Sequence, residues 1–314
     1  MKKLNVVIAG SNGMVGSSIY KALLNSKKYL PIELNRDIAD LTQFYDIQNF
    51  FKLTLPDIVI NCAAKVGGIH ANRTYPADFI RDNLLINLNL TEACFKNKVS
   101  RFINLGSSCI YPRDAEQPLK EEYLLTGPLE KTNEAYALAK IAGLEMCRHY
   151  RDQFGVNYHS LMPTNLYGDG DNYNLQNSHV LPALIRKFHE AKESNVDSVE
   201  VWGTGKARRE FLHADDLSDA ILFLLDIDSV PDMINIGTGT DITISELVSL
   251  VKDTVQFEGD IVYNTDMPDG TPVKRLDMTI MNNLNWKPKI LLQEGLQRTY
   301  KDFLYRLKNN KLKA

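Results

Sequence analysis

A short apolar segment that runs directly into a glycine-rich turn constrains the fold of this chain more than any other feature. Residues 4–9 read Leu-Asn-Val-Val-Ile-Ala, and glycine then recurs at every third position, at Gly10, Gly13 and Gly16. A helix-compatible run follows to about residue 25. In this strand-turn-helix setting, a Gly-x-x-Gly-x-x-Gly pattern binds the pyrophosphate of a dinucleotide at the helix N-terminus. We therefore predict a dinucleotide site at this turn.

Beyond the turn, short apolar runs alternate with longer amphipathic runs through the first half of the chain. The apolar runs 57–61, 101–105 and 157–162 fit strands, and apolar residues recur at helical spacing from about 83 to 97 and from about 134 to 153. This alternation is typical of β-α-β units. We predict an α/β fold with a Rossmann-type, doubly wound parallel sheet.

The second half of the chain is less regular. Turn-forming residues fill 166–178, which predicts a long loop. After it we expect a helix over about 179–193, a strand near 198–202 and a helix near 215–226, and Ser245 begins another amphipathic helix. A length of 314 residues favours a division into two domains.

The composition excludes several classes of protein. The chain carries 36 Lys and Arg against 39 Asp and Glu, a net charge of −3, so we expect no nucleic-acid partner. No apolar run approaches the ~20 residues that span a bilayer, so no membrane association is expected. The four cysteines form no Cys-x-x-Cys pair and no histidine cluster accompanies them, which predicts no metal site and favours a reducing, cytoplasmic location.

The end of the expected second strand bears on which dinucleotide binds. A basic side chain there neutralises the 2′-phosphate of NADP, whereas an acidic one accepts from the free ribose hydroxyl of NAD. Arg36 suits the phosphate, Glu33 falls inside the strand, and Asp37 comes one residue late. We predict NADP over NAD, with an ordinary surface arginine as the alternative interpretation of Arg36.

A tyrosine and a lysine lie four residues apart in the helix expected over 134–153. This spacing puts the Tyr136 phenol and the Lys140 ammonium on one helix face, where the cation is expected to favour the phenolate. Ser107 follows the strand 101–105, at the edge where parallel sheets place their ligands. Tyr136 is therefore a candidate proton donor and acceptor near neutral pH.

The glycine-rich turn, Ser107, Tyr136 and Lys140 together resemble the extended short-chain dehydrogenase/reductases that act on nucleotide sugars. Within that branch the chain is similar to the GDP-L-fucose synthase family, and the resemblance covers essentially the whole sequence. The blocks that carry it are 63–68, 106–112, 129–134, 139–143, 162–168, 178–184, 202–205, 209–213 and 269–272.

This resemblance implies an activity, a domain division and an assembly. The implied reaction is NADPH-dependent conversion of GDP-4-keto-6-deoxy-D-mannose to GDP-L-fucose, by epimerisation at C-3 and C-5 and then hydride reduction at C-4. The implied NADP-binding Rossmann domain covers 1–165 plus about 213–237. A smaller, mostly C-terminal α/β substrate domain covers 166–212 plus about 238–314. A homodimer that pairs the two long helices of the first half is also implied.

Roles for individual residues follow from the same resemblance. The implied reduction triad is Ser107, Tyr136 and Lys140, and Cys109 and His179 form the implied acid/base pair for epimerisation. The implied substrate contacts are Lys187 and Arg209, at the diphosphate, with Trp202 and Asp269. The implied cofactor contacts are Gly10, Ser11, Asn12, Gly13, Met14, Val15, Gly16, Arg36, Asp40, Leu41, Ala63, Leu105, Gly106, Lys140, Pro163, Thr164, Asn165, Leu166 and His179. The family often has a basic residue where this chain has Asn12, so phosphate recognition depends more on Arg36.

Two separate acid/base groups suit the implied chemistry. A ketone at C-4 acidifies the protons at C-3 and C-5, and inversion needs one group to remove a proton and another to return one on the opposite face. Cys109 lies two residues after Ser107, so an extended segment is expected to point both side chains the same way. Ser107 and Tyr136 are placed to donate to the C-4 oxygen as it gains charge. Whether Cys109 or His179 is the base at each carbon stays open.

Other functions share the same fold. A nucleotide-sugar 4-epimerase, a 4,6-dehydratase or another 4-reductase would have the same triad, although the dehydratases usually carry an acidic pair near 108–109, where this chain has Ser108 and Cys109. A non-catalytic NADP-sensing regulator is the alternative from another class. Such regulators commonly lose the tyrosine or the lysine, and both are present here.

Overall fold

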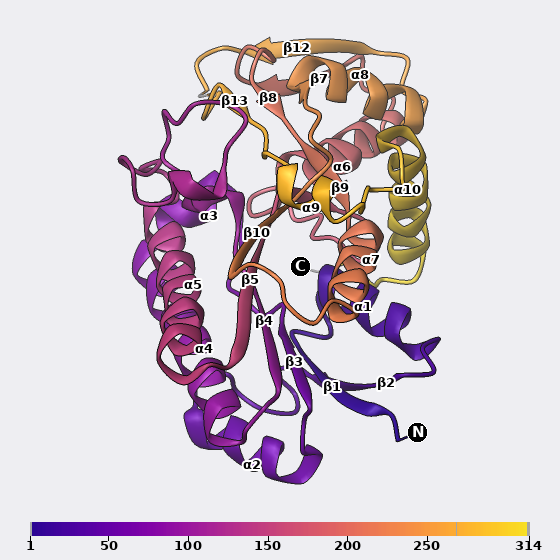
Figure 1. The fold of residues 1–314 in the computed structure, drawn as a ribbon. Helices are drawn as coiled ribbons and strands as arrows, with labels where there is room; N and C mark the ends of the chain where they lie inside the picture. The colour runs from indigo at the N-terminus through magenta and orange to yellow at the C-terminus, as the bar shows by residue number, and fades with distance from the viewer. Residues whose placement is uncertain (1, 268, 313–314) are drawn as a thin grey trace.

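The computed structural model describes residues 2–267 and 269–312, and its centre is a six-stranded parallel sheet (Figure 1). The strands are ordered β10-β5-β4-β3-β1-β2, so the chain builds outward from β1 in both directions. This reversal beside β1 is where doubly wound sheets bind ligands. The predicted sheet and its four predicted strands are confirmed. The strand bounds are β1 Leu4–Ala9, β2 Tyr29–Leu34, β3 Ile58–Asn61, β4 Arg101–Leu105, β5 Asn157–Pro163 and β10 Met233–Ile236.

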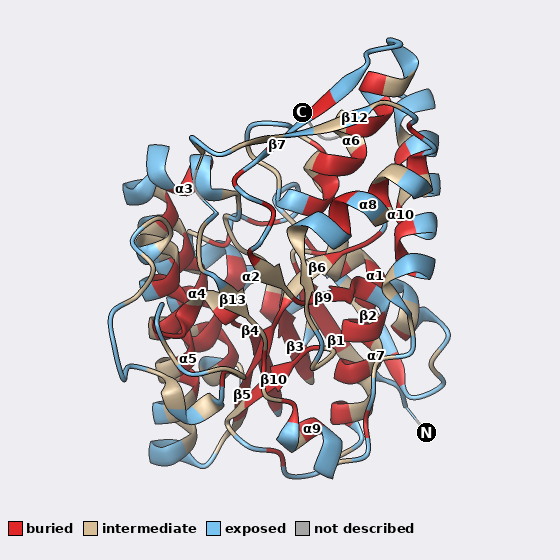
Figure 2. Cartoon of the chain, turned by 90° about the horizontal axis from the view of Figure 1, so that it is seen from above, coloured by how far each residue is buried: buried red, intermediate tan, exposed pale blue. Residues whose placement is uncertain are grey.

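Helices cover both faces of this sheet because its strands are apolar on both sides. Val6 and Ile8 of β1 share a hydrophobic cluster with α1 and α7, whereas Val7 and Ala9 share another with α2, α4 and α5. The buried residues accordingly concentrate in the sheet and on the inward faces of the helices (Figure 2). The helix bounds are α1 Met14–Leu24, α2 Phe44–Thr54, α4 Pro76–Lys96, α5 Glu134–Phe154 and α7 Ala214–Leu225.

Helix α4 begins earlier than the apolar spacing predicted. It starts at Pro76 rather than near residue 83. Proline is well tolerated at the first helical position, where its missing N–H has no partner to lose, and Asp78 in the first turn suits the positive end of the helix dipole. The capping signal therefore marks the start that the periodicity missed.

A second, smaller unit carries its own hydrophobic cluster, drawn from residues between 167 and 303. It lies beyond the carboxyl ends of the large sheet (Figure 1). Strands β7 and β12 pair in parallel, β8 lies between β11 and β13, and β6 pairs with β9. The bounds are β6 Asn165–Tyr167, β7 Ser198–Trp202, β8 Arg208–Arg209, β9 Phe211–His213, β11 Ile242–Thr243, β12 Asp260–Asn264, β13 Val273–Lys274, α6 Val180–Glu193, α8 Ile244–Val255 and α10 Leu292–Lys308.

Most second-half predictions agree with these elements. The segment 166–178 is a loop except at its start, where β6 takes residues 165–167 into a short strand because β9 offers it a parallel partner. Between β9 and β11 the chain returns to the large sheet through α7 and β10. The remaining short elements are α3 Ile69–Thr74, α9 Thr279–Asn283 and the 3₁₀ turns η1 Ser108–Ile110 and η2 Glu121–Tyr123.

Candidate active site

The glycine-rich turn connects β1 to α1 in the close-packed form that its pattern predicts. Gly10 has φ +83°, and a Cβ there would lie 2.8 Å from the backbone nitrogen of Ala63. A Cβ on Gly16 would collide with the carbonyl oxygen of Gly10, so this position tolerates no side chain. Gly13 caps the N-terminus of α1. The N-terminus of α1 and the three glycines therefore lie together at the carboxyl end of β1.

A buried hydroxyl in this turn has no hydrogen-bond partner within the described part of the chain. This hydroxyl belongs to Ser11, which is 2% exposed and whose Oγ makes no hydrogen bond to the described residues. An orphaned donor beside free helix amides suits the oxygens of a bound pyrophosphate. Arg36 follows the end of β2 and is exposed to solvent. The turn thus fits a dinucleotide, and Arg36 is free to meet it at the β2 edge.

Most of the other expected cofactor residues lie at carboxyl ends of strands or in the turn before α2, whereas Met14 and Val15 lie in α1, Lys140 in α5 and His179 at the N-cap of α6. Asp40 accepts from the backbone N–H of Thr42 at 2.9 Å, and the buried Leu41 carbonyl accepts from Asn89 at 3.1 Å, so both shape that turn. Thr164 and Asn165 direct their side chains to the carbonyl oxygen of Glu210. Seven of the expected cofactor residues end or follow β3, β4 or β5, or lie in β6. They are Ala63, Leu105, Gly106, Pro163, Thr164, Asn165 and Leu166.

Helix α5 presents Tyr136 and Lys140 to the end of β4. The Lys140 Nζ donates to the carbonyl oxygen of Leu105 at 2.6 Å and lies 5.8 Å from the centre of the Tyr136 ring. Burial raises the pKa of Tyr136, the charge of Cys109 adds to this, and a hydrogen bond with Ser107 opposes it. The prediction that the Tyr136 pKa is lowered is therefore wrong, because desolvation of the phenol is the largest influence on it. Burial also lowers the pKa of Lys140 to about 8.

Cys109 lies in a 3₁₀ turn rather than in the extended segment that we expected. The Ser107 Oγ accepts from the backbone N–H of Cys109 at 3.2 Å and caps η1, so the chain curls directly after Ser107. The Cys109 Sγ accepts a hydrogen bond from the Nδ2 of Asn133 at 3.2 Å and another from the Nζ of Lys274 at 3.3 Å. Burial raises the pKa of this thiol, but Lys274, the Ser107 hydrogen bond and Arg209 outweigh burial and lower it overall.

His179 is the N-cap of α6, as the predicted helix start required. The preceding loop is held by Gly68, whose N–H donates to the Asn177 carbonyl at 2.9 Å. A Cβ on Gly68 would lie 2.6 Å from the Ser178 carbonyl oxygen. Burial lowers the pKa of the His179 imidazole, and the charge of Lys274 lowers it further. Lys274 therefore acts on both members of the expected acid/base pair.

The four expected substrate residues form two linked groups in the smaller unit. The Lys187 Nζ lies 5.4 Å from the centre of the Trp202 ring, which is 50% exposed. The Asp269 carboxylate accepts from the backbone N–H and the hydroxyl of Thr204, both at 2.7 Å. Arg209 donates to the carbonyl oxygens of Thr271 and Asp269. Asp269 thus holds the turn after Trp202 and lies beside Arg209.

Three functional candidates escaped the sequence analysis: Asn133, Lys274 and Glu210. Asn133 and Lys274 lie in or beside resemblance blocks, but only the fold brings them to Cys109. Glu210 is fully buried and accepts backbone N–H groups of Thr238 and Gly239, after β10, and of Leu276, after β13. Its position between Arg209 and Phe211 in a block was the available signal. This carboxylate ties the large sheet to the segment that carries Lys274.

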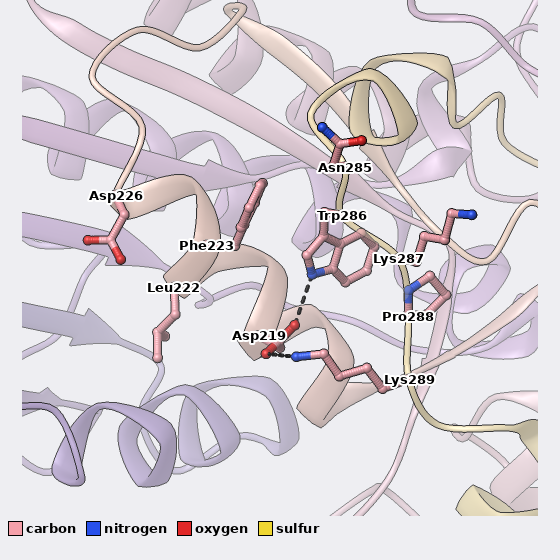
Figure 3. A pocket seen from close by; sticks show the side chains of 9 residues that line it. All are labelled: Asp219, Leu222, Phe223, Asp226, Asn285, Trp286, Lys287, Pro288 and Lys289. Atoms are coloured by element: carbon pink, nitrogen blue, oxygen red, sulfur yellow. Dashed lines mark hydrogen bonds and ion pairs between the residues drawn. The ribbon is translucent and has the colours of Figure 1, made fainter.

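Two cavities lie apart from the Cys109 cluster. One of about 610 Å³ lies between α7 and residues 285–289, where Asp219 accepts from Trp286 and Lys289 (Figure 3). None of the expected site residues lines it. The other, of about 460 Å³, is lined by Ser11 and Asn12 together with residues of α1 and α10. No cluster of His, Cys, Asp and Glu in residues 2–267 and 269–312 could hold a metal ion, and no helix there is long and apolar enough for a bilayer.

Comparisons with known proteins identify the family. Residues 6–237 match the model of the NAD dependent epimerase/dehydratase family. GDP-L-fucose synthase 1 of Arabidopsis thaliana is 49% identical over 303 residues, which cover 96% of this chain and 94% of that protein.

Solved structures agree with this result. A GDP-6-OMe-4-keto-L-xylo-heptose reductase from C. jejuni has a TM-score of 0.91 at 36% identity, covering 98% of this chain and 99% of that one. A GDP-L-fucose synthetase from Naegleria fowleri bound to NADP has a TM-score of 0.90 at 26% identity, covering 99% and 96%. The resemblance drawn from the motif blocks is confirmed, and the chain belongs to the NAD dependent epimerase/dehydratase family.

Proposed function

We propose that this protein converts GDP-4-keto-6-deoxy-D-mannose to GDP-L-fucose with NADPH, by epimerisation at C-3 and C-5 and reduction at C-4. The observation that carries the proposal is the cluster at the end of β4, where Cys109 is held among Ser107, Asn133 and Lys274 beside Tyr136. The near-complete alignment with a GDP-L-fucose synthase supports the same substrate. An epimerase or dehydratase that recycles its cofactor needs no such activated thiol at this position.

NADPH supplies the hydride when it is bound. The amides at the start of α1 and the Ser11 hydroxyl are the groups proposed to hold the pyrophosphate, and Arg36 the 2′-phosphate. Lys140 is long enough to reach a ribose hydroxyl from its place beside Leu105. The NADP-bound relative supports this choice of cofactor.

Epimerisation requires two proton transfers at each inverted carbon. One of Cys109 and His179 removes the proton and the other returns one to the opposite face, while the electron pair of the broken C–H bond moves onto the C-4 oxygen. Ser107 and Tyr136 donate hydrogen bonds to that oxygen. The same two donors then polarise the ketone for reduction.

Tyr136 provides the last proton. Because burial and the neighbouring thiol raise its pKa, the phenol is protonated at neutral pH and acts as the acid toward the alkoxide at C-4. Burial lowers the pKa of Lys140 to about 8, so its ammonium is a stronger acid than that of an ordinary lysine. Lys187 and Arg209 are proposed to meet the diphosphate, with Trp202 against the nucleotide and Asp269 holding the Trp202 turn.

The proposal extends to the assembly, domains and location. Exposed leucines on α4 and α5 (Leu84, Leu88, Leu138) support a homodimer through these helices. The separate cluster drawn from residues between 167 and 303 supports the division into 1–165 plus about 213–237, and 166–212 plus about 238–314, but Leu276, Met278, Met281 and Trp286 pack in a cluster of the large sheet. Four unpaired cysteines support a cytoplasmic location.

Turnover of GDP-4-keto-6-deoxy-D-mannose with NADPH tests this function. We expect one NADPH oxidised per product, followed at 340 nm, and inverted configuration at C-3 and C-5 by NMR. Reduction without inversion would indicate a plain 4-reductase, and no net oxidation a 4-epimerase or a 4,6-dehydratase. A Tyr136→Phe variant that kept the full biological effect would favour the regulator.

A further inference from the structure

The sulfur of Cys109 is surrounded by hydrogen-bond donors. The Asn133 amide approaches it at 3.2 Å from the N-cap of α5, and the Lys274 ammonium approaches it at 3.3 Å from β13. A thiolate only accepts hydrogen bonds, whereas a neutral thiol is a weak acceptor and must place its own proton. Two donors directed at one sulfur therefore form a site for the anion.

We propose that Lys274 is a positioning residue that holds Cys109 as a thiolate, ready to take a proton from the sugar. This role rests on the proposed epimerase function. Lys274 lies 165 residues after Cys109 in the chain. It belongs to the smaller unit, whereas Cys109 follows a strand of the large sheet.

The backbone around Lys274 is anchored on both sides. Lys274 pairs with Arg209 in the parallel β13–β8 ladder. The N–H of Leu276, two residues later, donates to the buried Glu210 at 2.8 Å, and the Arg275 carbonyl accepts from Leu119 at 2.7 Å. The lysine stem thus starts from a fixed point, which limits the entropy lost when its ammonium is ordered.

No carboxylate within residues 2–267 and 269–312 forms an ion pair with Lys274. Its nearest compensating anion in that part of the chain is therefore the Cys109 thiolate. The other groups that act on the sulfur are Ser107 from its own turn, Tyr136 and Asn133 from α5, and Arg209 from β8. The pKa of Cys109 is lowered overall despite its burial, and Lys274 is the largest of the influences that lower it.

This placement also explains how charge is managed during proton abstraction. When the thiolate takes a proton, an S–H bond forms, the C–H bond breaks, and the electron pair moves to the C-4 oxygen. The sulfur loses its charge as the oxygen gains one. The Lys274 ammonium keeps its charge and, near His179 as well, lowers the pKa of that imidazole. One cation thus favours an anionic sulfur, and it makes the His179 imidazolium a stronger acid for returning a proton on the opposite face.

Alkylation of Cys109 measures the proposed effect without any turnover. The free protein is treated with iodoacetamide across pH 5–10, and Cys109 modification is followed by peptide mass spectrometry. Burial raises the pKa of Cys62 and Cys147 to about 12 and also raises that of Cys94, so these thiols do not interfere. We expect Lys274→Met to raise the midpoint by about one pH unit, and so to slow alkylation at neutral pH about tenfold.

Matched variants complete the test. Lys274→Arg keeps the positive charge, so its alkylation midpoint should lie close to that of the wild type. Lys301→Met, at an exposed lysine of α10, should leave the midpoint unchanged. If Lys274→Met does not fold, the alkylation midpoint is measured with Lys274→Gln, which also removes the charge. A wild-type midpoint in a folded, uncharged variant at position 274 overturns the proposal. If the midpoint shifts but no proton exchange occurs at C-3 and C-5 of the substrate, the proposed function fails and the Lys274–Cys109 coupling stands.

Discussion

Replacing the buried Lys140 should stabilise the fold while it removes a group needed for the reaction. Lys140 is 3% exposed, and burial lowers its pKa from 10.5 to about 8. The difference of about 2.5 units corresponds to about 3 kcal/mol at 1.36 kcal/mol per unit. Loss of the charge-assisted hydrogen bond from the ammonium to Leu105 offsets about 1.5–3 kcal/mol of this. We therefore expect Lys140→Met to raise the free energy of unfolding by about 1 kcal/mol at pH 7.

The pH dependence carries the stronger test. Because the folded-state pKa is depressed, the unfolded chain binds more protons between about pH 8 and 10.5, so wild-type stability gains about 1.4 kcal/mol per pH unit from this group in that window. Urea unfolding of both proteins from pH 7 to 10 should show the advantage of Lys140→Met shrinking as pH rises above 8. The exposed Lys301→Met is the control, with no such trend. A difference that stays constant with pH, or a destabilised variant at pH 7, refutes the reasoning.

Three further substitutions probe the site. Cys109→Ser should abolish exchange of the C-3 and C-5 protons with solvent, measured by NMR in D₂O, yet leave NADPH affinity unchanged; equal loss of both would make Cys109 structural. Arg36→Ala should raise the KM for NADPH about tenfold or more, the value of a lost charge-assisted hydrogen bond, without changing that for NADH; equal effects on both cofactors contradict the phosphate contact. Gly68→Ala should destabilise the fold by about 1–3 kcal/mol in urea and slow proton exchange, because its Cβ meets the Ser178 carbonyl beside His179; wild-type values for both would be evidence against this packing.

The sheet and the glycine-rich turn were predictable because their signals are local. Apolar runs of strand length and glycines three residues apart are visible within 16 residues at the beginning of the chain, and the structure places them as expected. The start of α6 at His179 was equally local. The start of α4 at Pro76 was not predicted because the regular apolar spacing begins only near residue 83.

The site itself depends on contacts that sequence spacing does not contain. The turn at Cys109 is closed by two hydrogen bonds that Ser107 accepts, from the backbone N–H groups of Cys109 and Ile110, which no pattern of apolar residues predicts. The expected lowering of the Tyr136 pKa was wrong because burial, which the sequence does not show, is the largest influence on that pKa. Lys274 reaches Cys109 only through the register of β13 with β8, a long-range pairing.

The late position of β10 in the chain has a consequence for biosynthesis. This strand, Met233–Ile236, pairs with β5, Asn157–Pro163, at the end of the large sheet (Figure 1). Until about 70 further residues have left the ribosome, β5 presents an uncovered row of backbone donors and acceptors along an apolar strand. Such an edge templates pairing with other nascent chains. Truncations that end before residue 233 should therefore accumulate as aggregates rather than as a soluble fragment, even though they contain every residue of the reduction triad.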